Sequence, residues 1–465
     1  MGKREAASMN MTEGAIIPQI LIFFLPILIG TFFQQLYNTV DAVIVGKFVG
    51  KEALGAVGGT TGHLINLFLG VFIGISSGFS VIISQQFGAK KRRNVSECVH
   101  TAMMFALISG GALSLAGVFL LPKALYYMNV PAGMIDQASI YLKIYFVGMV
   151  PNLIYNMGAA ILRAVGDSFR PLLFLIISCF ANIILDIAFV IGLGMGVEGA
   201  ALATVLSQLL SALMVLAVLS KSRNDSYRLI FKFLHIHWGY LKKMFYIGIA
   251  AGFQSAMYTV SNIYIQSKVN YFGIDTIAAW TAYTKIDVIF WITIQSVGIA
   301  VTAFIGQNFG AGNRSRVKKG IRTGLGIAAV LTATITFGLL LFGEKIFSVF
   351  TQDPQVLTIA LRIQRLIAPL YFTYIFIEIY SGALRGVGDC WVPMMMTGLG
   401  ICVLRILWIG FRLPSHRVLE TIIVSYPLSW FSTSLLFVFY MHQKSRLRRW
   451  LSSGNTEEKG EGLNH

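Results

Sequence analysis

The sequence predicts an all-α polytopic membrane protein with twelve transmembrane helices in two pseudo-symmetric six-helix lobes. Hydrophobic residues make up 56% of the chain and charged residues only 12%, which leaves too few polar groups to cover a soluble globule. The chain also contains twelve apolar stretches that can each cross a bilayer, for which a helix needs about 20 residues. Finally, the two halves carry the same short motifs at one constant separation.

Two separate markers define this internal repeat. The motif LRAVGD at residues 162–167 recurs as LRGVGD at 384–389, and QQFGA at 85–89 recurs as QNFGA at 307–311. Both pairs are 222 residues apart, so they report one duplication of about half the chain. In a chain this apolar, such a duplication is typical of transporters built from two related lobes.

Each apolar segment predicts one helix, and six helices fall in each half. We expect an N-lobe over residues 1–220 and a C-lobe over 244–445. The connecting residues 221–243 mix basic, aromatic and apolar side chains, a pattern that predicts an amphipathic helix on the cytoplasmic membrane surface. The polar tail at 446–465 is expected to be flexible. The expected spans are 17–45, 54–86, 96–121, 138–162, 171–192, 198–220, 244–268, 276–305, 320–342, 357–384, 394–410 and 419–441.

The distribution of Lys and Arg predicts the orientation in the membrane. Most of the 37 basic residues fall on one set of alternate loops and on the two terminal tails, so both termini are expected in the cytosol, with the chain in the plasma (inner) membrane. Basic cytosolic loops next to anionic lipid also explain the net charge of +17 without a nucleic-acid partner. The segment before the first helix has no small-residue cleavage site, so that helix is expected to be retained.

A polar stripe runs along the first predicted helix. Gln34, Asn38 and Asp41 are spaced at i, i+4 and i+7, so their side chains lie on one face, with Tyr37 at its edge. A charge inside a bilayer costs about 2.5–3.5 kcal/mol on insertion scales, so it is usually retained for pairing or for function. This face is therefore expected to point toward protein or water.

The fifth and sixth predicted helices carry matching polar groups. Asn182 and Asp186 are spaced at i and i+4, and counting from the ends of the spans places Asp41, Asp186 and Thr204 at similar depth in the outer half of the N-lobe. Carboxylate, amide and hydroxyl oxygens suit either a hydrogen-bonded proton or a small hard cation such as Na⁺. The alternative is that these groups only hydrogen-bond helices to one another.

The C-lobe contains two further acids within predicted spans. Glu378 lies near the middle of the tenth helix at a depth comparable to Arg405 on the eleventh, which leaves two interpretations, a structural ion pair or a second cation or substrate site. In the eighth helix, Asp287 and Trp291 are spaced at i and i+4 and could line a cavity where the indole makes cation–π contacts.

The two LRxVGD turns favour a structural role. Arg163 and Asp167, like Arg385 and Asp389, flank a glycine at a cytoplasmic helix end, where glycine permits a left-handed cap and the following proline begins the next helix. We expect these Arg and Asp side chains to clamp neighbouring helix ends, with any gating role secondary.

Taken together, the motifs resemble those of the multidrug and toxic compound extrusion (MATE) family, and its bacterial DinF-like branch in particular. The resemblance covers about residues 15–445 and depends on QQLYNTVD at 34–41, ANIILD at 181–186, GAALAT at 199–204 and the two LRxVGD turns. It implies two six-helix bundles related by a pseudo-twofold axis, a central cavity, and export of organic cations against an inward flow of H⁺ or Na⁺. Some sodium-coupled relatives are thought to use acids in the C-lobe, but this chain offers Gln254 and no carboxylate on its seventh helix.

The predicted function is secondary active multidrug efflux by a monomer, without a cofactor, coupled to H⁺ or Na⁺. The coupling residues are expected to be Asp41, Asp186, Asn182 and Thr204, and the substrate cavity is expected to contain Gln34, Tyr37, Asn38, Gln254, Asp287, Trp291 and Glu378. A lipid-linked oligosaccharide flippase of the same superfamily is the main alternative, and a membrane-embedded transferase is a weaker one. Enzyme functions are disfavoured because the sequence has no HExxH motif, no phosphate-binding loop and no Cys or His cluster with metal spacing.

Overall fold

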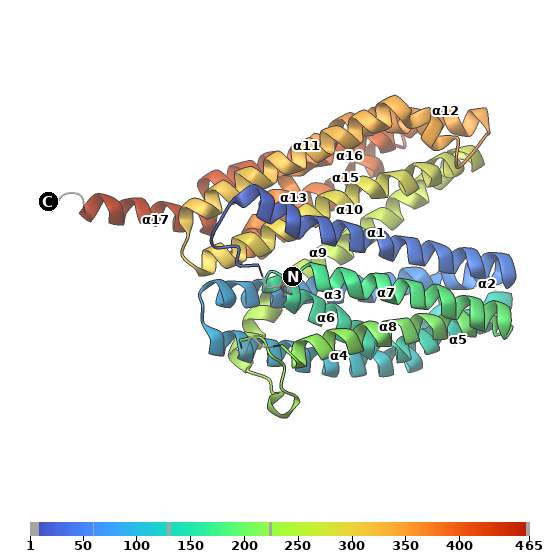
Figure 1. Cartoon of the computed structure of the whole chain (residues 1–465). Helices are drawn as coiled ribbons and strands as arrows, with labels where there is room; N and C mark the ends of the chain where they lie inside the picture. Colours follow the sequence, from blue (N-terminus) through green and yellow to red (C-terminus); the bar gives the residue numbers. More distant parts are fainter. Residues whose placement is uncertain (1–8, 59, 128–131, 223–225, 462–465) are drawn as a thin grey trace, which may run out of the picture. The chain divides into compact units, whose positions relative to one another are not determined.

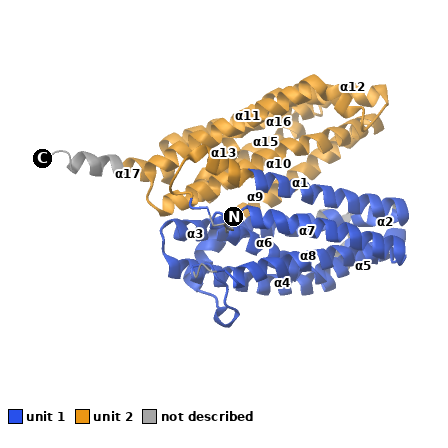
Figure 2. Ribbon diagram, in the orientation of Figure 1, with its two compact units in different colours: residues 1–10, 25–249 blue, residues 11–24, 250–465 orange. Residues whose placement is uncertain are grey.

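The computed structural model describes residues 9–58, 60–127, 132–222 and 226–461. Its residues fall into two compact units (Figure 2). Unit 1 comprises Met1–Asn10 and Leu25–Ile249, and unit 2 comprises Met11–Phe24 and Ala250–His465. Each unit thus corresponds to one half of the repeat, with two exceptions. Residues 11–24, near the beginning of the first half, belong to unit 2, and the beginning of the second half, up to Ile249, belongs to unit 1.

Unit 1 is a helical bundle (Figure 1) in which α4 packs on α5 and α6, and α8 packs on α6 and α7. The chain bends by 49° between α5 and α6, at Gly148. A Cβ at Gly148 would lie 2.5 Å from a Val205 methyl group of α8, so glycine allows the bend to approach α8 closely. The elements are α1 (Ile16–Phe48), α2 (Lys51–Gly58), α3 (Thr60–Gly88), α4 (Arg92–Tyr127), α5 (Ala132–Val147), α6 (Met149–Ala164), α7 (Phe169–Asp186), the π-helical η1 (Ile187–Gly192) and α8 (Gly196–Ser220).

Unit 2 is a second helical bundle, in which α10 packs against α11, α12 and α13, and α13 packs against α16 (Figure 1). Pro369, in the short 3₁₀ segment η4 (Ala368–Leu370), separates α12 from α13. The other elements are α9 (Trp238–Val269), η3 (Asn270–Phe272), α10 (Ile274–Gly310), α11 (Arg314–Phe347), α12 (Pro354–Ile367), α13 (Tyr371–Gly386), α14 (Trp391–Thr397), the π-helical η5 (Gly398–Val403), α15 (Leu404–Arg412), α16 (Leu419–Gln443) and α17 (Arg446–Glu461).

Every predicted span corresponds to helix in the structure. Within the described residues, ten helices are long and apolar enough to cross a membrane, and the bent α5–α6 pair makes up to eleven. The remaining predicted span, 244–268, lies in α9, which is long but is not among these helices. The reason is composition, because Gln, Ser, Thr, Asn and Tyr side chains recur along the second half of α9 and lower its hydropathy.

Both LRxVGD turns of the repeat have the same backbone structure. Gly166 and Gly388 adopt positive φ angles of 91° and 82°. The next residue of each turn donates its backbone N–H to the carbonyl of the leucine five positions earlier, at 2.9 Å for Asp167 to Leu162 and 2.9 Å for Asp389 to Leu384. This is the left-handed glycine cap expected from the sequence.

The predicted amphipathic helix over 221–243 does not form in the described part of that segment. Its only regular elements are the 3₁₀ turn η2 (Phe231–Phe233) and the beginning of α9 at Trp238. Backbone hydrogen bonds to α4 replace helical ones, because Ile230 donates its N–H to His100 Nε2 (3.1 Å) and His237 donates to Thr101 Oγ1 (3.0 Å). The tail also differs from expectation, since residues expected to be flexible continue as helix α17.

The N-terminal segment before α1 packs within unit 2. Asn308 Nδ2 donates to the carbonyl of Met11 (3.0 Å), and Met11 N–H donates to Gln307 Oε1 (3.1 Å). The Arg316 guanidinium donates to the carbonyls of Met11 (3.0 Å) and Gly14 (2.7 Å). The QNFGA copy of the repeat therefore provides the amides that hold this segment. We call residues 11–24 the first leader and residues 230–249 the second leader.

Candidate functional site

Two buried carboxyl groups meet in unit 1. Asp41 of α1 is 7% exposed and Asp186, the last residue of α7, is fully buried. The two side chains lie close enough to influence each other's charge. The π-helical segment η1 begins directly after Asp186, and such irregular turns inside helices are frequent at functional sites. The sequence-based prediction that these two acids share one depth agrees with their proximity.

The pair has few hydrogen-bond donors among the described residues. Asp41 Oδ1, both Asp186 oxygens and both polar atoms of Asn182 have no partner of normal hydrogen-bond geometry in the part of the chain that the structure describes. Thr204 is buried as well, but its hydroxyl donates to Ala200 O of its own helix at 3.0 Å. Buried polar atoms are nearly always hydrogen-bonded, so a group of them with free oxygens is able to accept a proton or a small cation.

Tyrosines surround this carboxyl pair. Tyr37 on α1 lies near both acids, as does Tyr141 of α5. Tyr145 lies near Asp41, and the Tyr141 and Tyr145 rings are 6.0 Å apart between centroids. The sequence analysis identified Tyr37 but missed both tyrosines of α5. Their spacing of i and i+4 on one helix face was the available signal.

A small cavity in unit 1 has Tyr37 in its lining. Its volume is about 50 Å³, which is enough for a few water molecules or an ion but well below the roughly 300 Å³ of a drug-sized site. Gln34 and Tyr37 line this small cavity, whereas Asn38 is an exposed side chain and does not, and their expected place in a substrate cavity stays a prediction. The other lining residues come from α1, α6, α7 and α8 and are Phe33, Asn152, Tyr155, Asn156, Leu175, Ser178, Cys179, Gln208 and Ser211.

The acids of unit 2 are held very differently. Asp287 of α10 accepts hydrogen bonds from Tyr283 (3.1 Å), from Trp291 Nε1 (2.6 Å) and from the hydroxyl of Tyr371. Three donors from two helices thus satisfy one carboxylate. Because Trp291 donates to Asp287, its N–H is occupied within the protein rather than available to cargo.

The predicted ion pair between Glu378 and Arg405 is wrong. Glu378 lies 3.3 Å from Arg385, two helical turns further along α13, and accepts a longer hydrogen bond of 3.5 Å from Tyr374. Arg405 instead donates to Ser429 (3.0 Å) and stacks on the Tyr426 ring, 3.9 Å from its centroid. Matching depths along two helices did not reveal that Arg385 shares the face of Glu378.

Aromatic rings fill the space around Asp287. Phe290 and Tyr371 stack with centroids 4.0 Å apart, and Trp291 meets Tyr374 edge to face at 4.7 Å. Trp430 is fully buried against both tyrosines. Gln254 on α9 is half-buried, and no hydrogen bond within the described residues joins it to this group. The cluster is therefore packed, with its polar atoms mostly satisfied internally.

Neither LRxVGD turn pairs its own Arg with its own Asp. Asp167 lies 3.4 Å from Arg170 and accepts the backbone N–H of that residue. Asp389 accepts a hydrogen bond of 2.8 Å from Tyr440 of α16. Burial raises the pKa of Asp167 above its ordinary value, while the N–H and guanidinium of Arg170 oppose this shift. Arg163 lies near Tyr155.

No group of three or more His, Cys, Asp or Glu side chains within the described ranges could hold a metal ion. The four cysteines are all buried as free thiols. A transition-metal centre thus has no ligand set among these residues, and the carboxyl pair of unit 1 offers the ligand chemistry of a proton or of a hard monovalent cation.

Comparison with known proteins places this geometry in a family. The sequence profile of the MatE family matches residues 26–188 and 250–409, which are most of the two halves of the repeat. The chain is 27% identical over 430 residues to the probable multidrug resistance protein YoeA of Bacillus subtilis, covering 91% of this chain and 92% of that protein. It is 24% identical over 377 residues to the probable multidrug resistance protein NorM of Thermotoga maritima, covering 80% of each.

The fold matches solved structures over nearly its whole length. A crystal structure of a MATE protein in a bent conformation aligns with a TM-score of 0.88 at 20% identity, covering 97% of this chain and 100% of the other. The chain is accordingly an all-helical multi-pass membrane protein. Because the profile matches both halves and the fold agrees over the full chain, this protein belongs to the MatE family of membrane transporters.

Proposed function

We propose that this transporter exports lipophilic organic cations in exchange for H⁺ or Na⁺, with the Asp41–Asp186 pair as the coupling site. The observation that carries the proposal is this buried pair, in which Asp41 and Asp186 approach each other with oxygens that accept no normal hydrogen bond from the described residues. Two relatives carry the name of probable multidrug resistance proteins, which supports drug-like cargo.

The coupling step follows from charge. With both carboxyls ionised, the pair carries two negative charges in a buried site, which favours uptake of one proton or one Na⁺ between them. Asn182 adds an amide oxygen, and Tyr37 and Tyr141 add hydroxyl groups nearby. If cargo and coupling ion weaken each other's binding, exchange between the two drives export.

Cargo selectivity is proposed from composition and charge. Loose recognition of flat cations needs apolar area, aromatic faces and a carboxylate that favours positive charge, and Met side chains adapt to different shapes. The chain supplies 34 Phe, 18 Tyr and 17 Met. We expect several unrelated lipophilic cations to compete for one site.

The deciding experiment uses everted membrane vesicles that contain the protein. An ethidium-type dye should accumulate when a proton gradient or a sodium gradient is imposed, and the effective gradient identifies the coupling ion. The matched control is Asp136→Asn, an exposed acid on α5, which should transport normally. Dye movement that is indifferent to both gradients would contradict coupled antiport.

A lipid-linked oligosaccharide flippase remains the second candidate because unit 2 buries a guanidinium, Arg405, that could attract a pyrophosphate. Equilibrium binding of a fluorescent cation to the purified protein separates the two functions. Displacement of the dye by other lipophilic cations supports antiport, and tighter binding of a lipid pyrophosphate than of any cation supports the flippase.

The orientation and the branch of the family belong to the same proposal. We place both termini in the cytosol from the distribution of basic residues, and we assign the DinF-like branch from the resemblance of the sequence motifs alone. In a background without the native cysteines, Lys91→Cys should resist a membrane-impermeant thiol reagent in intact cells while Arg417→Cys reacts. Both side chains are exposed in the structure. The opposite labelling pattern would reverse the orientation.

A further inference from the structure

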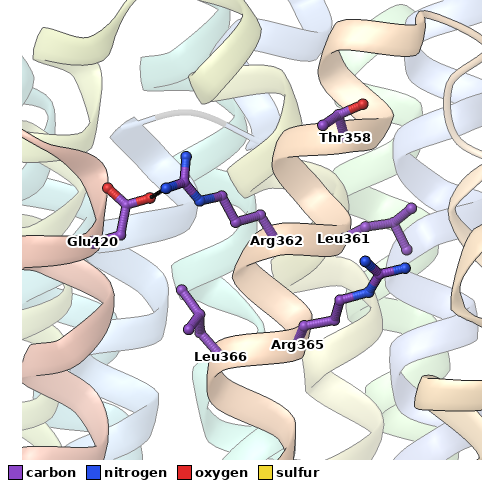
Figure 3. Close-up of a pocket in the computed structure, with 6 residues that line it drawn as sticks. All are labelled: Thr358, Leu361, Arg362, Arg365, Leu366 and Glu420. Atoms are coloured by element: carbon purple, nitrogen blue, oxygen red, sulfur yellow. Dashed lines mark ion pairs between the residues drawn. The ribbon is translucent and has the colours of Figure 1, made fainter.

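A surface pocket of about 550 Å³ lies in unit 2, between α12 and the beginning of α16 (Figure 3). Five of its lining residues share one face of α12, at positions spaced by three and four residues, and the sixth is Glu420 in the first turn of α16. The α12 residues are Thr358, Leu361, Arg362, Arg365 and Leu366.

The pocket carries one uncompensated positive charge. Arg362 lies 2.6 Å from Glu420, and Figure 3 shows its guanidinium reaching across from α12 to that carboxylate. Arg365, one turn further along, makes no ion pair or hydrogen bond within the described parts of the chain and points to the other side of the same face (Figure 3). The Arg362 side chain is 65% exposed, so its ion pair with Glu420 contributes little and can rearrange around a ligand.

The helix end itself does not provide the anion site. Asp353 caps α12, and its carboxylate accepts the N–H groups of Gln355 (2.8 Å) and Val356 (3.3 Å). That carboxylate neutralises the partial positive charge of the helix end. The remaining attraction for anions comes from the guanidinium groups, whose planar forks match the oxygens of a phosphate.

The position along the helices fits the level of lipid headgroups. Two membrane-spanning helical stretches begin here, Pro354–Gly386 and Leu419–Ser453, so the pocket lies near the ends of both. Arg362 and Arg365 precede the apolar stretch that continues through α13, as snorkelling arginines at a membrane interface do. Leu361 and Leu366 add apolar surface in the same pocket, and Leu366 is 39% exposed.

We propose that this pocket binds an anionic phospholipid, with Arg365 and Arg362 on the phosphate and the two leucines against the beginning of an acyl chain. Basic side chains at the membrane surface each add attraction for anionic lipid. Glu420 acts as an internal competitor, because it occupies Arg362 when no phosphate is bound. The proposal does not depend on the transported substrate or on the coupling ion.

The test measures binding of phosphatidylglycerol to the purified full chain in detergent by native mass spectrometry, with phosphatidylcholine as the competing lipid. Arg365→Gln should lower the apparent affinity for phosphatidylglycerol about fivefold. Glu420→Gln should raise it by a similar factor, because it releases Arg362. The matched control is Arg417→Gln, an exposed arginine in the loop before α16, which should leave binding unchanged.

The opposite signs of the two substitutions make the proposal easy to overturn. Equal binding by wild type and Arg365→Gln, or weaker binding by Glu420→Gln, would exclude this pocket as the lipid site. Inorganic phosphate at millimolar concentration should not displace the lipid, since the leucine contacts require an acyl chain. Full displacement by phosphate would instead identify a free-anion site and overturn the assignment to lipid.

Discussion

The two units bury acids in opposite ways. In unit 1, Asp41 and Asp186 face each other with few donors around them. In unit 2, Asp287 accepts three hydrogen bonds and Glu378 pairs with Arg385. A buried charge that is fully hydrogen-bonded stabilises one arrangement, whereas one that lacks donors can gain a proton or an ion. The comparison therefore supports the proposal that exchange occurs in unit 1 and that the acids of unit 2 have a structural role.

The fifth helices of the two halves extend this comparison. In unit 1, Asp186 directly precedes the π-helical η1, and in unit 2, the π-helical η5 ends at Val403, two residues before Arg405. Both helices thus contain a π-helical turn near a buried ionisable residue, but the charge is negative in one and positive in the other, and the two turns do not occupy equivalent positions of the repeat.

The largest expected effect is at the coupling pair. Asp41→Asn should abolish gradient-driven dye transport, because an amide cannot take up and release a proton or replace the charge that attracts Na⁺. Vesicle transport assays measure it, with size-exclusion profiles to confirm folding. The exposed Asp136→Asn serves as the matched control. Normal transport by Asp41→Asn would remove the functional contrast between the units.

Asp287→Asn should lower stability but leave gradient-driven transport in place, the opposite of the effect expected for Asp41→Asn. An amide oxygen cannot satisfy Tyr283, Trp291 and Tyr371 as a carboxylate does, and hydrogen bonds to charged groups contribute about 1.5–3 kcal/mol each. We expect about 2 kcal/mol lower stability, measured by thermal unfolding in detergent, with dependence on the ion gradient retained. If coupling is lost while stability is unchanged, the two acid clusters have equivalent roles.

Double-mutant cycles sharpen the assignment of partners in unit 2. Glu378→Gln combined with Arg385→Gln should show an interaction energy of about 1 kcal/mol in unfolding measurements, since the side chains lie 3.3 Å apart. Glu378→Gln combined with Arg405→Met should be close to additive. A large coupling between Glu378 and Arg405 would restore the ion pair that the structure contradicts.

The smallest effect is expected at the turn of unit 1. Asp167→Asn keeps an oxygen that can accept the Arg170 N–H but removes the charge, so the change in stability should be below about 1 kcal/mol. Because burial raises the folded-state pKa of Asp167, the folded protein binds this proton more tightly than the unfolded chain. Wild type should therefore gain stability relative to Asp167→Asn as the pH falls from 7 toward 4. If wild type instead loses stability relative to Asp167→Asn as the pH falls, the predicted direction of the pH dependence is wrong.

Much of the fold could be predicted because its causes are local in the sequence. Apolar length predicts helices, and the repeated LRxVGD turns predict two glycine caps, which Gly166 and Gly388 form with the same hydrogen bonds. Counting along the spans predicted that Asp41 and Asp186 lie at similar depth, although it did not predict that the two side chains meet. Each of these features depends on spacing along one helix or on composition.

Other features were missed. Depth was compared between two helices, which suggested Arg405 as a partner of Glu378, whereas the i and i+7 spacing of Glu378 and Arg385 on α13 was the signal that places these two on one face. Tyr141 and Tyr145 resemble packing residues until α5 is placed beside α1. Residues 221–243 have the composition of an amphipathic helix, yet the backbone N–H groups of Ile230 and His237 bind His100 and Thr101 of α4.

The exchanged leaders have a consequence for the order in which the protein is made. Unit 2 needs the first leader, which leaves the ribosome long before the rest of that unit, and unit 1 needs residues up to Ile249, which belong to the first helix of the second half. Neither half of the gene therefore encodes a complete compact unit. During synthesis, the backbone groups of Met11 therefore lack their final hydrogen-bond partners until Gln307, Asn308 and Arg316 have been made.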